Sequence, residues 1–163
     1  MTGINIPIEL YAELAKEYSN IIGAKVTYDG IAYIRRLIHE VKSIRKDFSV
    51  LVGFDDHLLP ALMMGGDGGV MALANVAPQI HVATYNAWVK GDLYKAYEGF
   101  KKILKLVQIY DIATSIPAAI KASLEIIGAP IKPCVRLPLR PELPEIRMKI
   151  ESIIKRLDLK IVY

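Results

Sequence analysis

Residues 21–53 read IIGAKVTYDGIAYIRRLIHEVKSIRKDFSVLVG. The first six residues are an apolar run that is interrupted by Gly23 and carries Lys25 near its end, a pattern typical of a buried strand. A helical period then extends over residues 31–45, with Asp29 placed to cap it. Residues 48–53 are a second apolar run. The stretch therefore predicts a strand, a helix and another strand in succession.

The flanking segments extend this pattern in both directions. Residues 7–17 place Leu10, Tyr11 and Leu14 on one face of a short amphipathic helix that begins at a proline. Downstream, residues 57–64 predict a short apolar helix that ends at a glycine pair, and residues 69–74 predict a third strand. Strands that alternate with helices at this spacing indicate an α/β protein with a covered parallel sheet.

After this α/β part, the periodicity predicts helices alone. These helices span residues 79–89, 93–112, 117–127 and 144–157, and a proline-rich loop, residues 130–141, precedes the last one. We therefore expect a partial (β/α) barrel of three βα units in residues 1–90 and a helical extension of the same domain in residues 91–163. Three units cannot close a barrel, which needs eight strands and about 250 residues. The bare edges of an open sheet would favour association.

The composition narrows the classes of protein further. Of the 163 residues, 53 % are hydrophobic, and the net charge of +4 is spread over basic residues with acidic residues between them, which favours solvated helix faces over nucleic-acid binding. The single cysteine, Cys134, excludes an internal disulfide and is expected to be an inert buried thiol. No signal peptide is visible at the N-terminus, so we expect a cytoplasmic protein. Residues 68–89 lack charge but contain polar residues and a proline, which argues against a membrane span.

Lys25 is the first candidate for chemistry. It lies between Ala24 and Val26, near the end of an apolar strand, where a solvated ammonium group is not expected. Burial would favour the neutral amine, which can attack a carbonyl group. The alternative is a lysine at a strand end whose ammonium group reaches water. From the spacing alone, this second interpretation is favoured.

Carboxylates follow the second expected strand. Gly53-Phe54-Asp55-Asp56 lies at the position where α/β sheets bind ligands. The two carboxylates would accept hydrogen bonds from substrate hydroxyl groups, or Asp56 would simply cap the next helix, and without further context the cap is favoured.

The remaining motifs indicate no further site. The glycines of residues 65–69 precede a strand and are interpreted as a tight turn. Three histidines show no spacing typical of a metal site, so we expect no metal. Lys121 and Arg136 are interpreted as helix-end and loop anchors. The histidines are His39, His57 and His81.

Five motifs in register resemble the dihydrodipicolinate synthase and N-acetylneuraminate lyase family. They are Gly23-Ala24-Lys25-Val26-Thr27, Gly53-Phe54-Asp55-Asp56, the glycines of residues 65–69, Pro117-x-x-x-Lys121 with Gly128, and Arg136-Leu137-Pro138-Leu139. Each motif alone is weak, but their order and spacing agree along nearly the whole chain.

The resemblance implies an eight-stranded (β/α) barrel with extra C-terminal helices, of which this chain holds strands six to eight. It implies that Lys25 condenses with pyruvate or another 2-keto acid to form an imine, without a cofactor. Thr27, Gly53, Asp55 and Asp56 match positions that line the pocket for the polyhydroxylated part of the substrate. Val70 matches an apolar wall beside the pyruvate moiety.

The resemblance favours a 2-keto-3-deoxy sugar acid as substrate. Asp55-Asp56 and Thr27 are similar to the lyase pattern, whereas Ala72 stands where neuraminate lyases have a serine, which argues against neuraminate itself. A dihydrodipicolinate synthase-like condensing enzyme is the alternative within the family.

The family's threonine pair after strand two and its tyrosine at the end of strand five are missing from this sequence. Thr2-Gly3 resembles the stretch just after that tyrosine. We therefore expect an incomplete half-barrel that forms an imine slowly, since positioned proton transfer contributes about 10² to 10⁴ in rate. The expected partners are a homo-oligomer or a missing N-terminal half. Two other hypotheses stay open. One is a non-catalytic assembly module with an unreactive Lys25, and the other is a homodimer that completes a pseudo-barrel.

Overall fold

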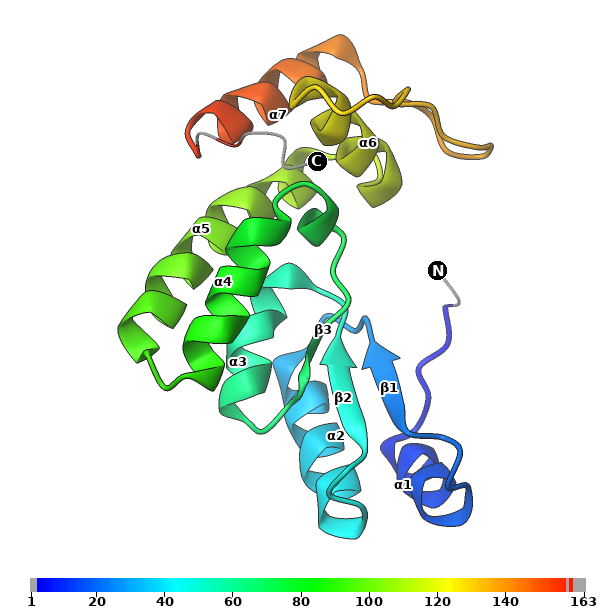
Figure 1. Ribbon diagram of the computed structural model, residues 1–163. Helices are drawn as coiled ribbons and strands as arrows, with labels where there is room; N and C mark the ends of the chain where they lie inside the picture. The colour runs from blue at the N-terminus through cyan, green and yellow to red at the C-terminus, as the bar shows by residue number, and fades with distance from the viewer. Residues whose placement is uncertain (1–2, 158, 160–163) are drawn as a thin grey trace. The chain divides into compact units, whose positions relative to one another are not determined.

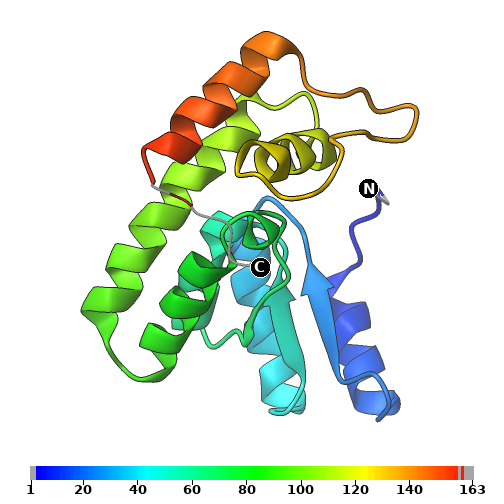
Figure 2. The same ribbon diagram turned by 45° about the horizontal axis from the view of Figure 1, so that its top comes forward.

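The computed structural model describes residues 3–157 and 159, and divides the chain into two compact units. The first unit extends to Met71 and the second begins at Ala72 (Figures 1 and 2). Thr2, which the sequence analysis placed after a fifth strand, lies outside the described residues. The expected boundary at residue 90 lies between two helices of the second unit, so the helix Pro78–Val89 belongs with the helices that follow it.

The first unit is built on a parallel three-stranded sheet in the order β1-β2-β3. The strands are β1 (Gly23–Val26), β2 (Ser49–Val52) and β3 (Gly68–Gly69). Lys25 of β1 pairs with Leu51 of β2, and Leu51 pairs in turn with Gly68 of β3. The expected α/β class with three parallel strands is therefore correct, and the sheet is consistent with part of a barrel.

The helices of the first unit share one core with the sheet. They are α1 (Ile8–Glu17), α2 (Ile31–Ile44), the 3₁₀ turn η1 (Asp55–His57) and α3 (Leu58–Met63). Val26, Val50 and Val52 belong to the same buried cluster as residues of these helices. Because successive strand residues point to opposite faces, Lys25 and Leu51 point away from that core.

Two charged side chains fix the loops of the first unit. The guanidinium group of Arg45 donates to the backbone oxygens of Ile21 at 2.9 Å and Ser19 at 3.2 Å, beyond the C-terminus of α1. Asp67 accepts hydrogen bonds from Lys42 at 2.8 Å and from the backbone N–H of Val50 at 2.7 Å. The bonds of Arg45 link the end of α2 to the connection between α1 and β1, and those of Asp67 link α2 and β2 to the residue just before β3.

Several local expectations are wrong. The third strand consists of two glycines instead of residues 69–74, and Leu73–Asn75 forms a 3₁₀ turn, η2. Asp29 does not cap α2, whose N-cap is Gly30 without a side-chain bond. The buried face of α1 carries Ile8, Ala12 and Ala15 instead of Leu10, because small residues let this helix approach the core.

The second unit is helical, as the sequence predicted. After η2 it contains α4 (Pro78–Val89), α5 (Leu93–Ile112), α6 (Ile116–Ile126) and α7 (Pro144–Lys155). Its core includes Leu106 and Ile109 of α5, Ala119 of α6 and Ile150 of α7. Within the described residues, no helix combines the length and the apolar character that crossing a membrane requires.

A loop between α6 and α7 is held at two points. Lys121 of α6 donates to the backbone oxygen of Cys134 at 2.6 Å, which agrees with its expected role as an anchor. Near the end of the loop, the buried carboxylate of Glu142 accepts the backbone N–H of Thr114 at 3.0 Å, just before α6 begins. Cys134 itself is exposed, so the expectation of a buried thiol is wrong.

Candidate active site

Three of the predicted site residues follow the C-terminal ends of the three strands. Thr27 follows β1, Gly53 follows β2 and Val70 follows β3. The backbone N–H of Gly53 donates to Val26 at 2.8 Å, and that of Val70 donates to Val52 at 2.8 Å, so the parallel pairing continues to these residues. Because the strands are parallel, all three residues lie at one edge of the sheet, where the arrows of β1 and β2 end in Figure 1.

Lys25 and Thr27 both lie beside Gly53 at this edge. A methyl carbon placed on Gly53 would lie 2.7 Å from Cβ of Thr27 and 2.9 Å from Cε of Lys25, and closest of all to the Thr27 hydroxyl oxygen. These separations are shorter than any ordinary carbon–carbon contact. The structure therefore brings together the lysine and two of the residues that the sequence placed in its site.

Lys25 is exposed in this structure, which agrees with the interpretation that the spacing alone favoured, a lysine at a strand end whose ammonium group reaches water, and not with a buried amine. Its neighbour Val26 is 5 % exposed and belongs to the core. The difference arises because strand alternation turns Lys25 to the face opposite the helices. An apolar sequence on both sides of the lysine therefore indicated a buried strand but not a buried side chain.

The two carboxylates lie on η1, directly after Gly53 and Phe54. Asp55 is completely buried and Asp56 is half-buried. The N-cap of α3 is His57, and no side chain caps this helix, so the interpretation of Asp56 as its cap is wrong. Val70 is 55 % exposed, which leaves its side chain available as an apolar surface.

His57, which the sequence indicated only as one of three histidines without metal-site spacing, belongs to this region. It is 9 % exposed, and its ring meets Phe54 edge-on at 5.7 Å between ring centroids. Within the described part of the chain, its Nδ1 atom is buried without a hydrogen-bond partner. The signal available in the sequence was a histidine directly after the aspartate pair.

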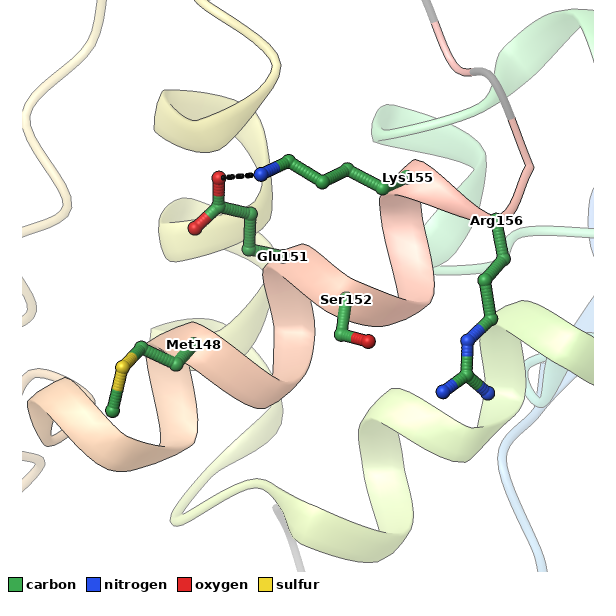
Figure 3. Close-up of a pocket in the computed structure, with 5 residues that line it drawn as sticks. All are labelled: Met148, Glu151, Ser152, Lys155 and Arg156. Carbon is green, nitrogen blue, oxygen red and sulfur yellow. Dashed lines mark ion pairs between the residues drawn. The ribbon is translucent and has the colours of Figure 1, made fainter.

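A shallow hollow beside α7 is lined by residues that are distant in sequence from this candidate site. It is lined by one face of that helix, on which Glu151 and Lys155 form an ion pair at 2.7 Å (Figure 3). The remaining lining residues are Met148, Ser152 and Arg156. Because one helix supplies all the groups, they do not converge on a ligand. Among the described residues, no three acidic, histidine or cysteine side chains gather as they would around a metal ion.

Comparison with known proteins identifies the family. The model of the dihydrodipicolinate synthetase family matches residues 1–157. An uncharacterized DapA-like lyase of Thermofilum pendens is 57 % identical over 160 residues, which cover 98 % of this chain and 53 % of the relative. A probable 2-dehydro-3-deoxy-D-pentonate aldolase of Escherichia coli is 38 % identical over 94 % of this chain and 51 % of its own length.

A solved structure shows the same fold. A prophage protein of the dihydrodipicolinic acid synthase family from Escherichia coli K12, in complex with pyruvate, matches with a TM-score of 0.92 and 36 % identity. The match covers 97 % of this chain and 53 % of that one. The chain belongs to the dihydrodipicolinate synthetase family, and it spans about half the length of the relatives that it matches.

Proposed function

We propose that this chain carries the Schiff-base lysine of a class I, pyruvate-dependent aldolase, and that Lys25 is this lysine. The observation that supports the proposal most directly is the position of Lys25 and Thr27 beside Gly53 at the C-terminal edge of a parallel sheet. That edge is where (β/α) barrels place their catalytic groups. The relatives that bear aldolase and lyase names belong to the same family.

In the proposed reaction, the neutral amine of Lys25 attacks the keto carbon of pyruvate and forms a carbinolamine. Loss of water gives an imine, which withdraws electrons from the neighbouring carbon while a carbon–carbon bond forms or breaks. Hydrolysis then releases the product and restores the amine. Lys25 is exposed in this structure, and the reaction needs a cover that excludes water from its site.

Further strands would provide this cover. The family resemblance supports placing β1, β2 and β3 as strands six, seven and eight of the family barrel, and the unpaired edges of the described sheet would accept further strands. The remaining strands would come from the same or from another polypeptide. The incomplete half-barrel of residues 1–163 would then form the imine slowly by itself.

The proposed substrate class is a 2-keto-3-deoxy sugar acid. Its hydroxyl groups would donate to the half-buried carboxylate of Asp56 and would bond to the hydroxyl group of Thr27, whereas Asp55 is completely buried and would lie behind them; Val70 would contact the C3 methylene of the pyruvate moiety. The name of the pentonate aldolase relative supports this class. A condensing enzyme like dihydrodipicolinate synthase is the second candidate, favoured by the family description.

Trapping with borohydride tests the proposal. The purified chain is incubated with pyruvate and sodium borohydride, and a reduced adduct is measured by intact mass and assigned by peptide mapping. We expect an adduct at Lys25 that is lost in Lys25→Ala. Lys16→Ala, which removes an exposed lysine from α1, serves as the matched control and retains the adduct.

A second arm supplies the rest of the barrel. The chain is coexpressed with the N-terminal half of the Thermofilum pendens relative, and the rate of adduct formation is measured again. We expect an increase of at least tenfold, because proton transfer groups and a cover for Lys25 are added. A folded chain that forms no adduct in either arm would contradict the proposal and would leave an assembly module as the better explanation.

A further inference from the structure

Gly53 is a glycine for a reason other than backbone conformation. The described glycines with positive φ are Gly3, Gly65, Gly68, Gly91 and Gly128, and Gly53 is not one of them. Its backbone lies in the sheet pairing, with its N–H bonded to Val26. Any residue can adopt such a backbone, so only space can require a glycine at this position.

The space that a side chain would need is already occupied. A methyl group on Gly53 would collide with the hydroxyl oxygen and Cβ of Thr27 and with Cε of Lys25, the last at 2.9 Å. Cβ of Thr27 and Cε of Lys25 therefore both adjoin the same point, next to the backbone of Gly53.

We propose that Gly53 is a positioning residue. Because it has no side chain, it leaves a space beside its backbone for the side chains of Lys25 and Thr27, and we call this space the seat. This role differs from direct substrate binding, which the family resemblance implies for Gly53. The inference rests on the proposed function for its purpose, but its geometry can be tested without pyruvate.

The seat restricts the conformations of Lys25, whose side chain is otherwise exposed. A lysine side chain has four rotatable carbon–carbon bonds, and an exposed amine would sample many directions. The Thr27 side chain and the backbone of Gly53 lie beside Cε of Lys25 and limit these directions, because all three adjoin the point that a methyl group on Gly53 would occupy.

The test follows Lys25 directly. Lysines are methylated reductively with ¹³C-formaldehyde, and the methyl resonance of Lys25 is assigned by its loss in Lys25→Arg. We expect Gly53→Ala to shift and broaden this resonance while the other lysine resonances stay in place. Gly30→Ala is the matched control, because its methyl group would meet the ring of Tyr28 at 2.6 Å instead of Lys25.

A second pair of variants separates Lys25 from Thr27. In Thr27→Gly with Gly53→Ala, the added methyl group meets only Lys25 among these two side chains, and this pair also relieves the closest collision if Gly53→Ala alone does not fold. We expect the Lys25 resonance to differ between this double variant and Thr27→Gly. Equal resonances in the two variants, in folded protein, would overturn the inference.

The pyruvate adduct provides the functional measurement. We expect Gly53→Ala to reduce the rate of borohydride-trapped adduct at least tenfold at saturating pyruvate, and Gly30→Ala to leave the rate within about twofold. An unchanged rate in Gly53→Ala would overturn the positioning role. A wild-type chain without any adduct would contradict the proposed function alone, since the methyl resonances still report on the seat.

Discussion

His57, a single residue at the candidate site, lowers the stability of the fold. A buried polar atom without a partner destabilises a protein by about 1–3 kcal/mol, and Nδ1 of His57 is such an atom in the described structure. We expect His57→Leu to raise the free energy of unfolding by up to about 1 kcal/mol, because loss of the ring contact with Phe54 offsets part of the gain. Urea denaturation measures the effect. His39→Leu, at an exposed position of α2, should change it by less than about 0.5 kcal/mol. A destabilised His57→Leu would contradict this account.

Tyr33 makes the stability of the first unit depend on pH. Its hydroxyl group donates to the backbone oxygen of Ile6 at 2.5 Å, and burial, followed by the neighbouring Tyr11, raises the pKa of Tyr33 to about 12. A raised pKa favours the neutral form in the folded state. This contribution is therefore complete below the ordinary tyrosine pKa of about 10 and is lost as the pH rises through 12.

We expect the stability difference between wild type and Tyr33→Phe to be constant from pH 7 to 9 and to shrink between pH 10 and 12. Urea midpoints at each pH provide the measurement. Tyr94→Phe, at an exposed position of α5, is the control and should show no such window. A difference that stays constant to pH 12 would contradict the prediction.

At the residue scale, the sequence located the candidate site but not the environment of its side chains. The spacing and the family resemblance selected Lys25, Thr27 and Gly53, and the structure places the first two beside Gly53. The exposure of Lys25 depends on which face of β1 the helices cover, and a run of apolar residues does not encode this. The absent side chain of Gly53 leaves no signal in a single sequence either.

At the element scale, Arg45 holds the connection between α1 and β1. Its guanidinium group donates to four backbone oxygens beyond and at the end of α1, on Ala15, Tyr18, Ser19 and Ile21. Hydrogen bonds from a charged group to carbonyl oxygens each contribute more than neutral ones. We expect Arg45→Ala to lower the free energy of unfolding by about 2 kcal/mol.

Two variants sharpen this prediction. Arg45→Lys keeps the charge but loses the planar fork of donors, so it should recover less than half of the loss. Arg36→Ala removes an exposed arginine whose ion pair with Glu9 is 3.8 Å long, and it should cost less than about 0.5 kcal/mol. Equal effects of Arg45→Ala and Arg36→Ala in chemical denaturation would contradict a role for Arg45 as a clamp.

Long periodic segments were predicted within one or two residues, because a helix of several turns repeats its pattern. The bounds of α5 agree fully, and those of α4, α6 and α7 differ by one or two residues. The third strand was misplaced because its residues, Gly68 and Gly69, carry no apolar signal. Their pairing with Leu51 and Val52 decides that they form a strand, and this pairing is a tertiary contact.

At the scale of the whole molecule, exposed apolar side chains predict self-association. One face of α4 exposes Val82 and Val89, and the start of α5 exposes Leu93 and Tyr94, each by more than half. Monomeric proteins rarely expose large contiguous apolar patches. We expect light scattering with size-exclusion chromatography to give a mass well above 18.2 kDa at micromolar concentration.

The same measurement on variants locates the surface. Val89→Lys together with Tyr94→Lys should lower the mass toward that of one chain. Met148→Lys, which changes an exposed apolar residue of α7, should not. If all three proteins elute as one chain of 18.2 kDa, these exposed residues do not drive association.

In the two longer strands, odd-numbered and even-numbered residues face opposite sides of the sheet, and this gives the protein engineer a choice of positions. Even-numbered residues, among them Val26, Val50 and Val52, pack against the helices, whereas Lys25 and Leu51 are odd-numbered and face the other way. Substitutions at odd positions therefore leave the helix-covered core unchanged. A library randomised at Thr27 and Leu51 can explore new substrate preferences while most of its members still fold. Selection then acts on the chemistry of the variants more than on the stability of their fold.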